Sequence, residues 1–366
     1  MTLPPPHTPS HQQTPASPTA PAQRRRPRAR LTRLAATCLI AAGTAALLTP
    51  TPAAGINNHH TNTAATERPT TTLEKIANFG ANPGNLTMYV YRPPQLPLHP
   101  AVVVALHGCT QSARIYADNS GLTTFADRYG FLLVFAETTS ANNPGQCFNW
   151  FQPLDNQRGQ GEAASIRQMV AYANTAYGTD RSRTYVTGLS AGGAMTSVML
   201  ATYPDVFTAG AVVAGLPYNC TKDTGPFTCM NPGVDGTPAA WAQRVRDAYP
   251  SYSGPWPRVA IWHGDNDTTV APRNADELRD QWTAVHGLSQ TPDRTSTIGP
   301  NATRSQEYLA TDGTVAVQVN KVPGIGHGTP VDPGTGPQQC GRTGTANFIA
   351  SICSSYWITK FFNLGS

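Results

Sequence analysis

The chain has 366 residues, of which 13% are charged, and its formal net charge is +5. A basic balance often indicates nucleic acid or an anionic membrane as the partner. Here six arginines and no acidic residue fall within residues 1–54, so the remainder carries 20 basic against 21 acidic residues. The near-neutral remainder argues against nucleic acid as a partner, and length alone allows one large domain or two smaller ones.

The first 54 residues are expected to be a signal peptide. A basic n-region at residues 24–33 contains the six arginines, and the uncharged h-region at residues 34–48 is rich in Ala and Leu. Such a segment is short for a membrane anchor, which is the alternative, and the adjacent arginines also permit twin-arginine export. We therefore expect a secreted, extracellular protein without stable membrane insertion. Residues 55–72 are polar and without periodicity, so they are expected to be a flexible tether.

Seven cysteines are present, and Cys38 lies inside the h-region. An even number in an exported chain indicates disulfides, with fifteen possible pairings for six cysteines. Close spacing suggests two local pairs and leaves a third: Cys220 with Cys229, Cys340 with Cys353, and Cys109 with Cys147. None of the six stands in a CxxC motif, so neither a metal site nor a cofactor is expected.

Apolar, β-rich runs alternate with helical patterns from Leu86 onward. Expected strands lie at residues 88–91, 101–106, 131–135, 184–187, 209–214, 259–262 and 315–322, and expected helices at residues 122–129, 162–177, 191–202, 274–286 and 345–363. Short continuous strands separated by amphipathic helices indicate the α/β class, with a mostly parallel sheet covered on both faces. No second composition shift or repeat is present, so we expect one domain at residues 73–366.

Ser190 stands where an expected strand meets an expected helix, at the centre of Gly188-Leu189-Ser190-Ala191-Gly192. The flanking glycines permit a turn so sharp that the serine side chain is exposed, which is the geometry of a nucleophile elbow. A Gly-rich turn without chemistry is the alternative, since five-residue matches arise by chance. The strand before, the helix after and a third glycine at Gly193 favour a nucleophilic serine.

Chain order limits the histidine that could serve this serine. In the α/β-hydrolase arrangement the acid and then the histidine follow the serine. His286 closes a helical pattern and is expected near the helix dipole, and His263 lies at a strand end ahead of a suitable acid. His327 lies in a Gly-rich loop after the 315–322 strand, where an imidazole can reach Ser190. His327 is therefore the expected general base.

The acid is expected just past the 259–262 strand, where Asp265 and Asp267 are the candidates. Asp267 lies further into the loop, where its carboxylate can hold the imidazole and stabilise the imidazolium. Asp265 fits a turn cap bonded to its own backbone. The two aspartates resemble the start of a calcium-binding loop only weakly. Such a loop has glycine at its sixth position and glutamate at its twelfth, where this chain has Val270 and Asp276.

Acyl transfer also needs donors for the oxyanion. One is expected to be the amide of Ala191, directly after the serine, and the other an amide after the 101–106 strand. We assign the second donor to Cys109, with Gly108 permitting the bend. A Cys109–Cys147 disulfide would stiffen this loop, although a role in stability alone is equally compatible with the sequence.

Together these residues resemble the extracellular polyhydroxybutyrate depolymerase family of serine esterases. The matching segments are Leu106–Cys109, Cys147–Phe151, Gly188–Met195, Ala201–Phe207, Ala214–Tyr218, Trp262–Asp267, Asn274–Trp282 and Gly326–Gly334. The resemblance runs from about Leu86 to the C-terminus. It implies an α/β-hydrolase catalytic domain and the roles given above to Ser190, Asp267 and His327. It also places His107 beside the oxyanion hole.

The same pattern is similar to feruloyl and acetylxylan esterases, so these are alternative activities; a secreted, non-catalytic binding protein on this fold is another. Many polymer-degrading family members carry a separate polymer-binding domain after the catalytic one, whereas nothing follows the last expected helix here. We therefore expect activity on amorphous polyester or soluble oligomers. Trp150 and Tyr218 are candidate substrate contacts, because flat amphipathic rings hold acyl chains, and core packing is the alternative for both.

Overall fold

A computed structural model of the protein describes residues 71–365. The expected signal peptide at residues 1–54 and nearly all of the expected tether at residues 55–72 lie outside the described residues. Within residues 71–365, no helix is both long enough and apolar enough to cross a membrane.

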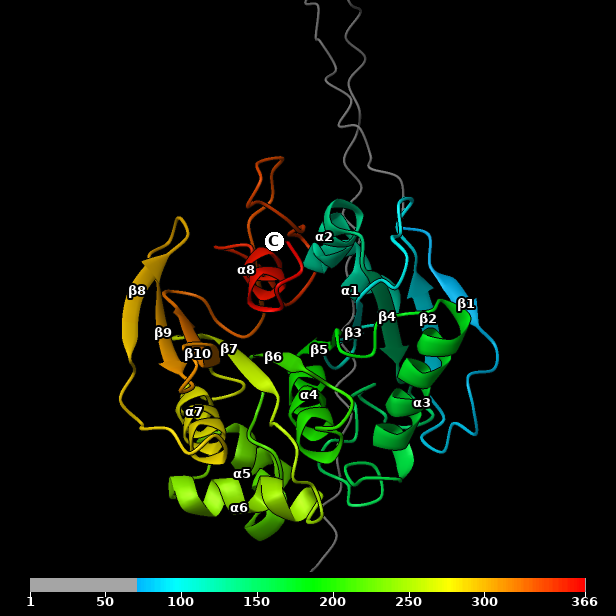
Figure 1. Ribbon diagram of the computed structural model, residues 1–366. Helices are drawn as coiled ribbons and strands as arrows, with labels where there is room; N and C mark the ends of the chain where they lie inside the picture. Colours follow the sequence, from blue (N-terminus) through cyan, green and yellow to red (C-terminus); the bar gives the residue numbers. More distant parts are fainter. Residues whose placement is uncertain (1–70, 366) are drawn as a thin grey trace, which may run out of the picture. The chain divides into compact units, whose positions relative to one another are not determined.

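A ten-stranded sheet forms the centre of the fold (Figure 1). Its strands are, in spatial order, β1 (Glu74–Ile76), β2 (Thr87–Tyr91), β4 (Leu132–Glu137), β3 (Val102–Leu106), β5 (Thr184–Leu189), β6 (Ala209–Val213), β7 (Arg258–Gly264), β10 (Val315–Val322), β9 (Thr303–Leu309) and β8 (Arg294–Ile298). The six from β4 to β10 are mutually parallel, and two antiparallel strands flank them at each edge. The expected mostly parallel sheet is confirmed.

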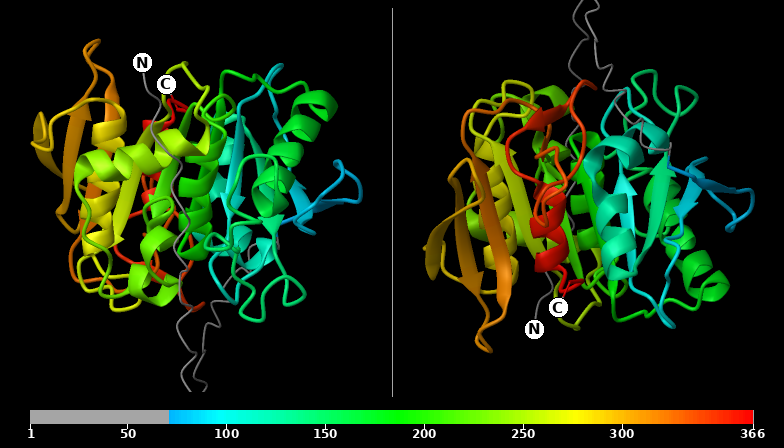
Figure 2. Two further views of the ribbon diagram at one scale, coloured as in Figure 1. Left: turned by 90° about the horizontal axis from the view of Figure 1, so that it is seen from below. Right: turned by 90° about the horizontal axis from the view of Figure 1, so that it is seen from above.

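Helices cover both faces of this sheet, as the two opposite views of Figure 2 show. One face carries α1 (Ala113–Ser120), α2 (Leu122–Tyr129) and α8 (Ser354–Phe361); the other carries α3 (Gly161–Ala176), α4 (Ala191–Thr202), α5 (Pro226–Met230), α6 (Pro238–Ala248) and α7 (Arg273–Val285). Each layer buries its own apolar cluster against the sheet. This explains why β3, β5 and β6 are buried along their whole length, and why β3 and β6 have continuous apolar sequences.

The expected helix at residues 345–363 is wrong in its first half. Residues Phe348–Ala350 form β12, which pairs in parallel with β11 (Thr329–Val331) in a separate two-stranded sheet. The helix begins only at Ser354, where the sulfur of Cys353 accepts a hydrogen bond from the Tyr356 amide. Long-range pairing with β11 and the bond from Cys353 to Cys340 therefore override the local helical pattern.

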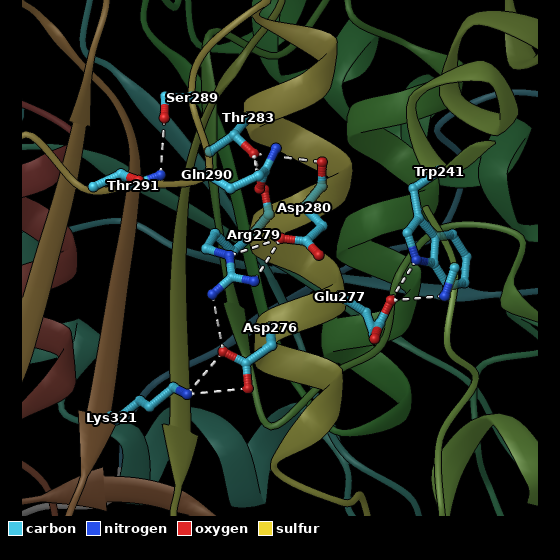
Figure 3. Close-up of polar contacts among 11 residues, drawn as sticks. Trp241, Asp276, Glu277, Arg279, Asp280, Thr283, Ser289, Gln290, Thr291 and Lys321 are labelled. Carbon is cyan, nitrogen blue, oxygen red and sulfur yellow. Dashed lines mark hydrogen bonds and ion pairs between the residues drawn. The ribbon is translucent and has the colours of Figure 1, made fainter. Parts of the chain in front are cut away.

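Helix α7 ties the helical layer to the sheet through its polar side chains (Figure 3). Glu277 accepts a 2.5 Å hydrogen bond from the indole nitrogen of Trp241 on α6. Asp276 accepts from the Lys321 ammonium on β10 at 2.8 Å, and the Arg279 guanidinium contacts the same carboxylate at 3.3 Å. These contacts fix α7 beside the end of β10, the strand that leads into the His327 loop.

Candidate active site

Ser190 lies between β5 and α4 in a backbone conformation that few non-glycine residues adopt, with φ 57° and ψ −117°. The residues two positions before and two positions after Ser190 must be glycines. A Cβ on Gly188 would lie 2.4 Å from the Gly192 carbonyl oxygen. A Cβ on Gly192 would lie 2.3 Å from the Leu106 oxygen. The Ser190 amide donates to the Val213 carbonyl at 2.9 Å, which holds the turn at the sheet edge.

The structure brings Ser190, His327 and Asp267 into one hydrogen-bonded chain. The Nε2 atom of His327 lies 2.8 Å from the Ser190 Oγ, and its Nδ1 atom lies 2.7 Å from an Asp267 carboxylate oxygen. Asp267 is 3% exposed and Ser190 8%. This is the arrangement in which an imidazole removes a serine proton while a carboxylate fixes its tautomer.

The Asp267 carboxylate is held in its charged form. Its second oxygen accepts 2.9 Å hydrogen bonds from the amides of Thr269 and Val270. Burial alone would raise the pKa of Asp267, but hydrogen bonds from His263 and His327, together with the backbone donor at Val270, place that pKa well below its ordinary value. The acid is therefore ionised throughout the neutral pH range.

Asp265 has a different place from the one its turn position predicts. Its carboxylate accepts the Gly324 amide at 2.7 Å, which joins the loop after β7 to the loop after β10. The Asn266 amide adds a second link to the Ile325 carbonyl at 3.1 Å. The expected cap on its own backbone was wrong because the His327 loop, distant in sequence, offers the donor.

The candidate oxyanion donors converge on the same edge of the sheet. Ala191 is the first residue of α4, and Cys109 follows β3. Across the part of the chain that the structure describes, neither amide donates a hydrogen bond to another group. Cys109 is disulfide-bonded to Cys147, and the Thr110 amide donates to the Gly145 carbonyl at 2.8 Å. Two unpartnered amides on a braced loop and a helix start are suited to an anion.

His107 supports this loop rather than donating into the hole. Its Nε2 atom accepts from the Thr138 amide at 3.3 Å, so Nδ1 carries the proton and donates to the Gly108 carbonyl at 2.8 Å. Burial lowers the pKa of His107 to about 4, although the Gly108 carbonyl opposes that shift. The ring is neutral at physiological pH, and both its nitrogens are engaged with backbone.

The candidate substrate contacts differ from each other. Trp150 is 7% exposed, packs edge-on against Phe151 and belongs to the apolar core. Tyr218 is 6% exposed, but it lines a pocket of about 550 Å³ and donates its hydroxyl to the Asn156 carbonyl at 3.3 Å. Of the two, the pocket lining includes only Tyr218.

Glu162 is a buried acid that the sequence patterns do not single out. It is fully buried at the start of α3 and accepts from the Asn149 amide at 2.7 Å and from the Asn149 side chain at 3.3 Å. Burial raises the pKa of Glu162 to about 8. These hydrogen bonds to Asn149 hold the segment that also contains Cys147 and Phe148. The ring centroid of Phe148 lies 4.9 Å from that of His107. An acid in the first turn of a helix usually stabilises the helix dipole from the surface, so the sequence position of Glu162 did not predict its burial.

The other two disulfides join Cys220 to Cys229 and Cys340 to Cys353, the local pairs that spacing suggested. Three disulfides are typical of a protein that folds in an oxidising compartment.

The chain is similar to proteins of a known family. Residues 86–304 match the family described as Esterase PHB depolymerase. The chain belongs to this esterase family. The esterase is 50% identical over 293 residues to poly(3-hydroxyalkanoate) depolymerase C of Paucimonas lemoignei, a match that covers 80% of this chain and 70% of that one.

Two further relatives carry other names. Feruloyl esterase B of Talaromyces stipitatus is 37% identical over 268 residues, covering 71% of this chain and 73% of that one. The solved acetyl xylan esterase from Aspergillus awamori is 33% identical with a TM-score of 0.64, covering 70% of this chain and 94% of that one. The expected α/β-hydrolase fold and family are confirmed, and the esterase is a carboxylic ester hydrolase.

Proposed function

We propose that the protein is a secreted serine esterase that hydrolyses short-chain poly(3-hydroxyalkanoates), polyhydroxybutyrate or its oligomers, through an acyl-enzyme on Ser190. The observation that carries the proposal is the chain of hydrogen bonds of 2.8 and 2.7 Å from Ser190 through His327 to Asp267. The 50% identity to a poly(3-hydroxyalkanoate) depolymerase supports the substrate class.

In the first half-reaction, the Ser190 Oγ attacks the ester carbonyl carbon while its proton passes to Nε2 of His327. The amides of Ala191 and Cys109 donate to the oxyanion that forms. Asp267 stabilises the imidazolium through Nδ1. Collapse of the tetrahedral intermediate breaks the bond to the leaving alkoxide, which takes the proton from Nε2 and departs as the alcohol.

In the second half-reaction, water attacks the acyl-enzyme carbonyl and gives its proton to Nε2 of His327. The same two amides, from Ala191 and Cys109, hold the second oxyanion. When this intermediate collapses, the Ser190 oxygen takes the proton back from His327 and the carboxylic acid leaves. The product ionises in water, and the side chains return to their starting protonation states.

The pocket beside Tyr218 supports a polyester chain as substrate. It lies between residues 151–157 and residues 218–226, and its lining combines rings and prolines with amide side chains, two threonines and Lys222. The exposed Leu154 and Phe227 adjoin this lining, one on each segment, at 74% and 81% exposure. A hydroxyalkanoate chain repeats apolar groups and ester carbonyls, which match apolar surface and amide donors. The loop to Tyr218 begins beside the elbow, since a Cβ on Gly215 would lie 2.8 Å from the Gly193 backbone.

Esters of plant cell walls are the second candidate substrates. The 37% identity to a feruloyl esterase and the 0.64 TM-score against an acetyl xylan esterase favour them. Both candidates use the same acyl-enzyme chemistry, so they differ only in the acyl group and alcohol that the pocket accepts.

Initial rates on a substrate panel test the proposal. Purified mature protein and its Ser190→Ala variant are compared on amorphous polyhydroxybutyrate, hydroxybutyrate trimer, methyl ferulate and acetylated xylan. We expect the highest kcat/KM on the hydroxybutyrate trimer, visible clearing of the amorphous polymer, and no turnover by the variant. A higher kcat/KM on methyl ferulate or acetylated xylan would assign the second candidate function instead.

We also infer export through the basic and apolar leader at residues 1–54, which leaves the catalytic domain at residues 73–366 behind a short tether. The three disulfides support this route. Expression of the full chain followed by N-terminal sequencing of the secreted form tests it. A mature protein that starts near Gly55 is expected, whereas retention of the whole leader in the cytosol would contradict it.

A further inference from the structure

His263 is a buried histidine that the proposed reaction does not use. It lies at the end of β7 and is 2% exposed. Its Nε2 atom lies 2.9 Å from the Val270 carbonyl oxygen and 3.4 Å from the same Asp267 oxygen that His327 contacts. The imidazole therefore contacts the acid at the oxygen that also faces His327.

The protonation of this ring follows from its contacts. A carbonyl oxygen only accepts, so Nε2 carries the proton and donates to Val270, with Asp267 as a longer second acceptor. The Nδ1 atom has no hydrogen-bond partner among residues 71–365. The Nε2–H group of His263 thus contacts both the backbone of the loop after β7, at Val270, and the Asp267 carboxylate on that loop.

Polar groups consequently surround both oxygens of Asp267. An ionised carboxylate offers about four lone-pair sites. One oxygen accepts from the Thr269 and Val270 amides, and the other faces Nδ1 of His327 and Nε2 of His263. Without His263, one side of the second oxygen would face a dry interior with no donor, and the carboxylate could rotate away from His327.

We propose that His263 is a positioning residue for the catalytic acid, acting on kcat through the orientation of Asp267. This inference rests on the triad assignment of the proposed function. His263 touches no substrate in this scheme, so its effect must pass through Asp267 to His327. Its loss should therefore change the chemical step and leave substrate binding unchanged.

A matched pair of variants tests the donor. In His263→Gln the side-chain amide reaches the place of Nε2, whereas the amide of His263→Asn is one methylene too short. On p-nitrophenyl butyrate we expect His263→Asn to lower kcat about tenfold, the low end for a hydrogen bond to a charged group, at unchanged KM. His263→Gln should retain kcat within about threefold. Equal kcat values in the two variants and the parent would overturn the proposal.

His286→Asn is the control for general effects of losing a histidine that contacts the backbone. His286 is half-buried, and its Nε2 atom lies 3.0 Å from a backbone oxygen, that of Pro257, at the end of α7. We expect its loss to lower the unfolding midpoint without changing kcat. If His263→Asn does not fold, His263→Leu replaces it in the same comparison with His263→Gln.

A double-mutant cycle separates positioning from a purely structural role. In an Asp267→Asn background, His263→Asn should change kcat by less than about twofold, because the group through which it acts has been altered. A full tenfold effect in that background would overturn the proposal. If Asp267→Asn alone leaves kcat unchanged, the triad assignment fails instead, and the two failures are thereby distinguishable.

Discussion

The Nε2 atom of His327 lies 2.8 Å from the Oγ atom of Ser190, although 137 positions separate the two residues. Parallel strands make this possible, because β5 and β10 both end at the same edge of the sheet and their following loops meet there. The loop after β7 completes the set with Asp267. A single sheet edge thus gathers Ser190, His327 and Asp267 from three distant parts of the chain.

Asp267→Asn should lower kcat by about 10⁴-fold at little cost in stability, because the amide favours the wrong imidazole tautomer. The neighbouring Asp265→Asn is the matched control. Among the described residues the Asp265 carboxylate accepts only the Gly324 amide, so we expect a loss of kcat of about tenfold or less. Steady-state rates with p-nitrophenyl butyrate measure both. Equal losses would show that the acid has been assigned to the wrong residue.

Removal of the Cys109–Cys147 disulfide should impair catalysis more than removal of the Cys220–Cys229 disulfide. The first braces the loop that carries the Cys109 amide, whereas the second joins η1 (Cys220–Asp223) to α5. Paired Cys→Ser changes should each cost about 2–4 kcal/mol in the free energy of unfolding. Only the first pair should also lower kcat, by about tenfold, because displacing an oxyanion donor costs less than removing it. Similar kcat values for both double variants would contradict a role of the Cys109–Cys147 disulfide in positioning the Cys109 amide.

Glu162 should make the protein less stable as pH rises. Its pKa rises from 4.5 to about 8 on folding, chiefly through burial, so between these pH values the folded chain holds a proton that the unfolded chain releases. The free energy of unfolding therefore falls across this interval, by an amount on the order of a few kcal/mol.

Urea unfolding of the parent and of Glu162→Gln at pH 5 and pH 8.5 measures this effect. The variant cannot titrate at this position, so its stability should change less between the two pH values. Glu74→Gln, at an exposed position, is the control and should follow the parent. Parallel pH dependence in the parent and Glu162→Gln would refute the prediction.

Polar substitution at the rim of the Tyr218 pocket should separate polymer from soluble substrate. Leu154 and Phe227 are exposed and adjoin the pocket lining, so Leu154→Ser with Phe227→Ser should weaken adsorption to polyester without touching the triad. We expect turnover of amorphous polyhydroxybutyrate to fall about tenfold and that of p-nitrophenyl butyrate to stay within about twofold. Leu98→Ser, at the other large exposed apolar side chain among residues 71–365, is the control. Equal changes on both substrates would rule out this rim as a polymer contact.

The sheet and the elbow were predictable because their signals are local. Burial and close backbone approach require continuous apolar strands and glycines around Ser190, and each requirement is written in a pattern of only a few consecutive residues. Helix α1 was not predicted, since its sequence is polar apart from the face that it buries. The helix expected at residues 345–363 failed because β12 depends on a strand and a disulfide that only the folded chain supplies.

The site was predictable to the extent that chain order and strand ends constrain it. The order of serine, acid and histidine along the chain predicted His327, and the end of the 259–262 strand predicted Asp267. The surroundings of these residues were not predictable, because they depend on contacts across the fold. His263 was set aside as a possible base, yet it lies 3.4 Å from the acid, and Asp265 bonds to Gly324, 59 positions away.

The acyl-enzyme on Ser190 is tested most directly by covalent labelling of the mature esterase with a fluorophosphonate, followed by peptide mass spectrometry and assay on hydroxybutyrate trimer. We predict one adduct per chain, on Ser190, with trimer hydrolysis lost in proportion to labelling. Ser190→Ala should take up no label and hydrolyse no trimer. An adduct at another residue, or trimer hydrolysis by Ser190→Ala at near-parent rates, would contradict this prediction.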